Sequence, residues 1–124
     1  MPKKVLIIED NRHLREILAS ILHTTGYVIM EAATGLQGIE SALAEQPSLI
    51  LLDLDLPDIN GIETARVLKQ NPLTTGIPII ACSAMSGSEW RDIALGVGMD
   101  DYLQKPISLA IIKAKIEKYT LLER

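Results

Sequence analysis

Five short apolar runs alternate along the chain with segments of helical periodicity, and this alternation constrains the fold more than any other feature. Most of the runs are continuously apolar, which is typical of strands buried on both faces of a parallel sheet. The predicted strands cover residues 5–8, 28–30, 49–52, 77–82 and 102–103. Parallel strands need a crossover between them, and the helical segments can supply each one.

A predicted helix follows each predicted strand. In the first helix the apolar positions repeat at i, i+3, i+4, i+7 and i+8 from Leu14, and Gly26 lies where a helix should end. The other helices are predicted at residues 35–46, 62–71, 88–97 and 108–122.

The last predicted helix is apolar on two sides. Its main stripe consists of Leu109, Ile112, Ile116 and Tyr119. Ile111 and Leu122 fall away from that stripe, near lysines. We expect wider burial for part of this second side, with docking of a partner as the alternative.

The strict strand–helix order predicts an α/β fold: a doubly wound, five-stranded parallel sheet with right-handed crossovers and helices on both faces. The 124 residues have the size of one domain and contain no linker-like stretch or repeat, so a single domain is expected over residues 1–124. In such sheets, ligands bind beyond the carboxyl ends of the strands.

Charge and cysteine content narrow the possible functions. The net charge of −4 argues against direct nucleic-acid binding, for which clustered Lys and Arg are expected. A single cysteine excludes an internal disulfide, and Cys82 is predicted to be a small buried strand residue. A continuous run of only four apolar residues precedes Glu9 and Asp10, which is too short for a signal peptide or membrane span, so we expect a cytoplasmic protein.

Chemically active side chains follow four of the predicted strands. Glu9 and Asp10 follow the first strand, Asp53 the third, Ser83 the fourth and Lys105 the fifth. Parallel strands bring all of these to one edge, where clustered carboxylates need a proton or a cation. Mg²⁺ prefers such oxygen ligands. Acids, a Lys and a hydroxyl together indicate phosphoryl transfer, in which a carboxylate can be the nucleophile.

The sequence resembles the response-regulator receiver domains of two-component signalling over essentially its whole length. The matching motifs are Glu9-Asp10, residues 53–57 with Gly61, Ser83-Ala84 and residues 102–106. The resemblance implies a flavodoxin-like (βα)5 fold with strand order 2-1-3-4-5. It also implies a phosphorylation-activated signalling switch that changes a surface formed by the fourth helix, fifth strand and fifth helix.

The resemblance also implies an acceptor and a metal site. Asp53 would accept a phosphoryl group from a histidine kinase or phosphotransfer protein. Mg²⁺ would bind Glu9, Asp10, Asp53 and the backbone carbonyl of Asp55. A carboxylate side chain at Asp55 adds negative charge beside the acyl phosphate, and the sequence does not give its effect on hydrolysis.

The remaining implied roles concern the phosphoryl group and the switch. Lys105 and Ser83 would bind the phosphoryl oxygens, and Tyr102 would turn inward when Ser83 moves. A cis peptide bond is expected between Lys105 and Pro106. The domain would promote only its own phosphorylation and dephosphorylation and would act as a monomer or as a phosphorylation-dependent dimer, with its downstream effector unknown.

Other interpretations stay open from the sequence. Residues 49–55 resemble the nucleophile strand of haloacid dehalogenase phosphatases, although the order of the later motifs argues against that family. A pseudo-receiver that has lost phosphorylation is the third possibility, but the acceptor, acid pair and Lys are all present. Singly, Asp10 could be a helix cap, and Asp58 or Asn60 could be turn residues.

Overall fold

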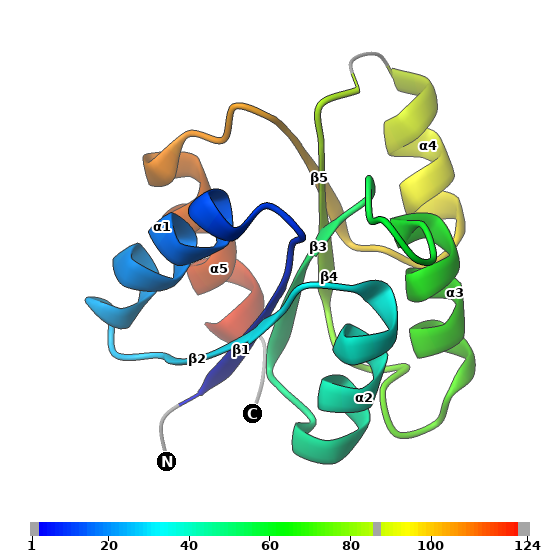
Figure 1. Cartoon of the computed structure of the whole chain (residues 1–124), viewed down its shortest axis with the longest axis horizontal. Helices are drawn as coiled ribbons and strands as arrows, with labels where there is room; N and C mark the ends of the chain where they lie inside the picture. Colours follow the sequence, from blue (N-terminus) through cyan, green and yellow to red (C-terminus); the bar gives the residue numbers. More distant parts are fainter. Residues whose placement is uncertain (1–2, 86–87, 122–124) are drawn as a thin grey trace.

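The computed structural model describes residues 3–85 and 88–121, and it confirms the alternation of strands and helices (Figure 1). The strands are β1 (Lys4–Ile8), β2 (Val28–Ala32), β3 (Leu49–Asp53), β4 (Ile79–Ser83) and β5 (Asp101–Gln104). The helices are α1 (Arg12–His23), α2 (Gly35–Glu45), α3 (Gly61–Gln70), α4 (Ser88–Gly96) and α5 (Leu109–Leu121).

The five strands form one parallel sheet in the order β2-β1-β3-β4-β5, as predicted. Helices α1 and α5 cover one face, and α2, α3 and α4 cover the other (Figure 1). The strand order reverses between β1 and β3, so the carboxyl ends of these two strands flank the expected ligand position.

Each face of the sheet has its own apolar core, which explains the continuous apolar runs. In β1, Val5 and Ile7 pack on the side of α1 and α5, whereas Leu6 and Ile8 pack on the other side. All four are almost fully buried. Cys82 of β4 is buried in the first of these cores, as predicted.

Two local features differ from the predictions. Strand β4 begins at Ile79, two residues later than predicted, because Pro78 has no N–H to donate to a neighbouring strand. In α5, Leu109 is 45% exposed and Ile111 is 51% exposed, so the stripe is shorter than predicted and wider burial is wrong for Ile111. Leu122, the other residue of that second side, lies outside the described residues.

Local capping explains where three helices begin. The side chains of Asn11, Thr34 and Asn60 each accept a hydrogen bond from the backbone N–H three residues further on. The cap of α1 is therefore Asn11 and not Asp10, which leaves the Asp10 carboxylate available for another role. Among the helices of the described residues, none combines the length and apolar character needed to cross a membrane.

Polar contacts tie the end of α3 to the starts of β4 and β5. Lys69 Nζ donates to the backbone carbonyls of Thr75 (3.1 Å) and Ile77 (2.8 Å), and lies 3.8 Å from Asp100 Oδ2. The same Asp100 carboxylate accepts from the N–H of Ile79 (2.9 Å). The end of the sheet opposite the predicted site is thereby fixed.

Candidate functional site

Three carboxylates meet at the carboxyl ends of β1 and β3. Ile8 and Leu52 are register partners, so Glu9 and Asp53 emerge side by side. The carboxylate oxygens of Glu9, Asp10 and Asp53 lie within 4.8 Å of one another. Glu9 and Asp53 are buried, whereas Asp10 is exposed. The sheet therefore brings together the three acids that the sequence analysis singled out.

Lys105 reaches this cluster from the end of β5. Its Nζ lies 3.0 Å from Glu9 Oε1 and 3.3 Å from Asp53 Oδ1. Burial alone lowers the Lys105 pKa, but the hydrogen bond to Glu9 and the charge of Asp53 raise it above its ordinary value. The peptide bond between Lys105 and Pro106 is cis, in agreement with the prediction.

Glu9 shows most clearly how burial at this edge of the sheet disfavours a charged carboxylate. Burial raises its pKa to about 7, even though the hydrogen bonds from Lys105 and from the Asn11 N–H act in the opposite direction. A cation bound beside these carboxylates would stabilise their charged forms. Carboxylate oxygens are ligands that Mg²⁺ prefers, so Glu9, Asp10 and Asp53 fit this metal.

Ser83 ends β4 beside the cluster and is fully buried. Its hydroxyl donates to Asp55 Oδ2 (3.3 Å) and accepts from the N–H of Met85 (3.1 Å). Tyr102 of β5 donates its hydroxyl to the carbonyl of Met85 (2.6 Å). Ser83 and Tyr102, the two predicted switch residues, thus contact the same short segment.

Two residues outside the predicted set position the site. Asp58 accepts from the N–H groups of Gly35 (2.8 Å) and Leu36 (2.9 Å), which lowers its pKa and fastens the loop after β3 to the first residues of α2. Arg15 donates to the carbonyl of Glu9 (2.8 Å). The sequence carries no signal for the Asp58 contacts, because the partners lie more than twenty residues away.

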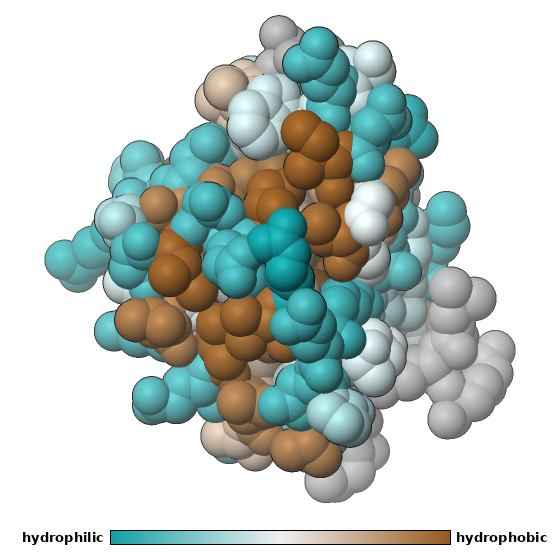
Figure 2. All heavy atoms as spheres, turned by 90° about the vertical axis from the view of Figure 1, so that its right-hand side faces the viewer, coloured by the Kyte–Doolittle hydropathy of each residue, from teal (hydrophilic) through white to brown (hydrophobic). Residues whose placement is uncertain are grey.

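A groove of about 520 Å³ adjoins Asp55 on the face of α3 and α4. Figure 2 looks onto this face, where apolar residues gather between polar ones. The lining residues are Leu54, Asp55, Leu56, Asn60, Ile62, Glu63, Arg66, Trp90 and Ile93. Trp90 therefore lies close enough to the site to report on changes around Asp55.

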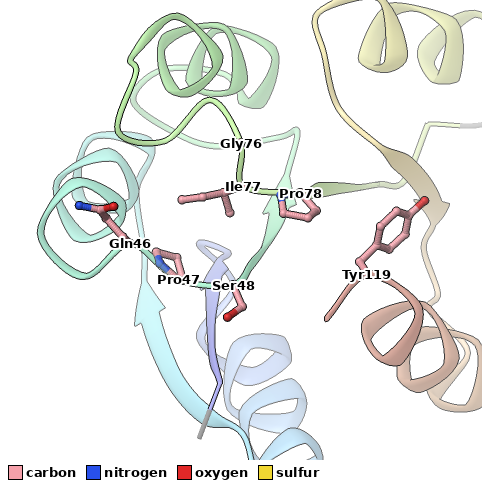
Figure 3. A pocket seen from close by; sticks show the side chains of 7 residues that line it. All are labelled: Gln46, Pro47, Ser48, Gly76, Ile77, Pro78 and Tyr119. Atoms are coloured by element: carbon pink, nitrogen blue, oxygen red, sulfur yellow. The ribbon is translucent and has the colours of Figure 1, made fainter. Parts of the chain in front are cut away.

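A second hollow, of about 330 Å³, lies at the opposite end of the sheet, where β3 and β4 begin (Figure 3). It is lined by Gln46, Pro47, Ser48, Gly76, Ile77, Pro78 and Tyr119. None of these side chains is a carboxylate or a cation. This hollow therefore lacks the charged groups that phosphoryl chemistry needs.

Comparison with known proteins decides the family. The family model for the response regulator receiver domain matches residues 5–117. This chain belongs to the response regulator receiver domain family. Receiver domains interact with histidine kinases or phosphotransfer partners. As a member of this family, the chain is a phosphorylation-activated signalling switch.

Curated relatives differ in length. The phosphate regulon transcriptional regulatory protein PhoB of Pseudomonas aeruginosa is 39% identical over 93% of this chain and 50% of its own length. The polar-differentiation response regulator DivK of Brucella anthropi is 36% identical over 96% of this chain and 97% of its own length. The receiver domain thus spans about half the length of some relatives and nearly all of others.

Solved structures share the fold. A CheY-like response regulator receiver domain protein from Methanospirillum hungatei matches with a TM-score of 0.92 and 27% identity, over 98% of this chain and 96% of the other. The receiver domain of a sensor histidine kinase from Pseudomonas aeruginosa matches with a TM-score of 0.86 and 29% identity, over 97% and 98% of the two chains. That protein is described with a magnesium ion coordinated in its active site cleft.

Proposed function

We propose that this receiver domain accepts a phosphoryl group on Asp53, and that Mg²⁺ binds Glu9, Asp10, Asp53 and the backbone carbonyl of Asp55. The observation that carries the proposal is the position of Lys105 Nζ between Glu9 (3.0 Å) and Asp53 (3.3 Å), at the edge of the sheet where three carboxylates meet. This group can balance the charge of a new anion on Asp53.

The reaction needs little more than positioning. A carboxylate oxygen of Asp53 forms a bond to the phosphorus of a phosphohistidine, and the bond from phosphorus to the imidazole nitrogen breaks, leaving its electron pair on that nitrogen. Lys105 then pairs with the phosphoryl oxygens in place of the Asp53 carboxylate. Bound Mg²⁺ supplies charge neutralisation and orientation of these oxygens.

The phosphoryl group would then bias the switch through Ser83. An acyl phosphate brings about two negative charges and new acceptor oxygens, and the Ser83 hydroxyl donates to one of them. Hydrogen bonds to charged groups contribute about 1.5–3 kcal/mol each. Shifting a two-state equilibrium from 1:99 to 99:1 takes about 5.5 kcal/mol. Ser83 and Lys105 together supply an effect of that size, and Tyr102 turns inward as Ser83 moves.

The proposed roles of these residues imply a class of phosphodonor and a surface for output. We expect a histidine kinase or phosphotransfer protein as the phosphodonor, and output through the surface of α4, β5 and α5 to an effector protein or domain. The domain promotes only its own phosphorylation and dephosphorylation. We place it in the cytoplasm, as a monomer or phosphorylation-dependent dimer, without direct contact to nucleic acid or membrane.

Labelling with acetyl phosphate and Mg²⁺ tests the proposal. Mass spectrometry should show one added phosphoryl group that hydroxylamine removes, and Asp53→Asn should abolish it. Asp92→Asn, which removes an equal charge from α4, is the control and should label normally. Stoichiometric labelling of Asp53→Asn would refute the acceptor, absence of labelling in the wild type would indicate a pseudo-receiver, and turnover of an external phosphoester would indicate a phosphatase.

A further inference from the structure

The turn between β1 and α1 carries Asp10 and is held by contacts of the residues on either side of it. The N–H of Glu9 donates to the carbonyl of Ala32 (3.0 Å), so β1 stays attached to β2 up to Glu9. The N–H of Asn11 donates to Glu9 Oε2 (3.1 Å). The carboxylate of Asp10 is exposed, so its direction depends on how firmly these neighbours are fixed.

Arg15, in the first turn of α1, reaches back to the backbone carbonyl of Glu9. Its Nη1 donates to this oxygen (2.8 Å), and its Nε donates to Glu31 Oε1 (3.2 Å). The Arg15 side chain is only 16% exposed, against 40% for Glu31. A planar guanidinium donates in fixed directions. One side chain therefore connects the ends of β1 and β2 and determines where the Glu9 carbonyl lies.

This carbonyl belongs to the peptide that joins Glu9 to Asp10. A peptide unit is planar, so fixing its oxygen also fixes the direction in which the chain leaves β1. A rotation of the peptide would turn Asp10 away from Glu9 and Asp53, although their carboxylate oxygens lie within 4.8 Å of its own in the structure. The position of Asp10 in the cluster thus depends on the bond that Arg15 makes.

We propose that Arg15 is a positioning residue for the metal site, which holds the peptide between Glu9 and Asp10 so that the Asp10 carboxylate is directed at bound Mg²⁺. Glu31 in turn orients the guanidinium. This inference rests on the proposed function, in which Glu9, Asp10 and Asp53 bind the metal. It concerns a residue that contacts a metal ligand and not the metal itself.

The charge of Arg15 and its bond to Glu9 have opposite effects on Mg²⁺ affinity. A positive charge close to the site repels the metal, so loss of the charge alone would tighten binding. Loss of the bond frees the peptide and would weaken binding. The direction of the change in affinity therefore separates positioning from a general effect of charge.

Calorimetric titration with Mg²⁺, without any phosphodonor, measures this direction in variants that circular dichroism shows to be folded. Arg15→Met keeps the length of the side chain but has no donor. It should bind Mg²⁺ about threefold more weakly than wild type, below the range of about 10–100-fold for partners of ligand side chains, because Arg15 contacts the backbone. Arg15→Lys, which keeps a donor, should recover most of the affinity. Unchanged or tighter binding by Arg15→Met would overturn the proposal.

Arg12→Met is the matched control. Arg12 lies in the same turn of α1, is 82% exposed and pairs with Glu16 (2.8 Å). This variant should bind Mg²⁺ as tightly as wild type or more tightly, because it loses the same charge but leaves the Glu9 carbonyl bonded. A loss equal to that of Arg15→Met would show that the bond to Glu9 is not the cause and would overturn the proposal.

Glu31→Gln provides a second test, which remains available should Arg15→Met fail to fold. It should weaken Mg²⁺ binding less than Arg15→Met does. In the Arg15→Met background it should have no further effect, since Glu31 acts through the guanidinium. An equal effect in both backgrounds would overturn the connection from Glu31 to the metal site through Arg15.

Asp10→Ala separates this inference from the proposed function. Mg²⁺ affinity that is unchanged in Asp10→Ala would overturn the metal site itself and the role of Arg15 with it. A loss of affinity in Asp10→Ala without any loss in Arg15→Met would refute the role of Arg15 alone.

Discussion

Replacement of Lys105 by Met tests how the buried acids are balanced. Lys105 Nζ contacts Glu9 and Asp53, whose side chains are 4% and 2% exposed. Removing one partner of a buried ion pair costs about 3–5 kcal/mol, because the remaining charge stays buried and uncompensated. The Lys105 side chain itself is 21% exposed, so solvent screens part of the interaction. We therefore expect the metal-free variant to lose about 2 kcal/mol of unfolding free energy at pH 8.

The loss should decrease at lower pH. Burial raises the pKa of Glu9 from 4.5 to about 7, so between these values the folded protein holds a proton that the unfolded chain lacks. Such a group contributes stability that is present below pH 4.5 and is lost as the pH rises through 7. Without the Lys105 ammonium, protonation of Glu9 becomes easier still. The variant should therefore be closer to wild type at pH 5.5 than at pH 8.

Urea unfolding followed by circular dichroism, with a chelator present, measures these differences. Lys113→Met is the matched control, because Lys113 is an exposed residue of α5. Adding Mg²⁺ at pH 8 should recover much of the stability lost in Lys105→Met, since the metal replaces the missing positive charge. Equal stability of the two variants at pH 8, or the same loss at both pH values, would refute the electrostatic account.

Three further predictions concern Asp10, Gly61 and Cys82. Asp10→Ala should raise metal-free stability and weaken Mg²⁺ binding roughly tenfold by calorimetry, and an unchanged affinity would remove Asp10 from the metal site. A Cβ on Gly61 would lie 2.4 Å from Leu54 Cα, so Gly61→Ala should cost about 3 kcal/mol in urea unfolding, whereas Gly96→Ala should not destabilise. Burial raises the pKa of Cys82 to about 12, so a thiol reagent should label it only as fast as the protein opens, and rapid labelling under native conditions would contradict this.

The sequence predicts the position of a site residue correctly where the strand that precedes it determines that position. The runs before Glu9, Asp53 and Ser83 are apolar on both faces, so they predict buried parallel strands, and the polar residue that follows each one must lie at the same edge. Pairing of β1 with β3 then brings Glu9 and Asp53 together. The three acids could therefore be placed from the sequence, and Mg²⁺ could be predicted from their chemistry.

Contacts between distant loops could not be placed in this way. Asp58 binds the first N–H groups of α2, and Asp55 binds Ser83, yet either acid alone looks like an ordinary turn residue. The exposure of Ile111 was also missed, because helical periodicity gives the angle of a side chain around the axis but not how far a neighbouring surface extends. These features depend on how separate elements meet.

The contacts of Lys69 and Asp100 restrain one end of the segment that connects β4 to β5. The end of this segment that precedes β5, close to Gly98, is held where Asp100 contacts Ile79 and Lys69. The other end begins directly after Ser83. A displacement that starts at Ser83 should therefore be largest in the first turn of α4, around Trp90, and should decrease toward Gly98. A partner that distinguishes the two forms should therefore bind at that first turn, and a label placed near Gly98 should report almost no movement.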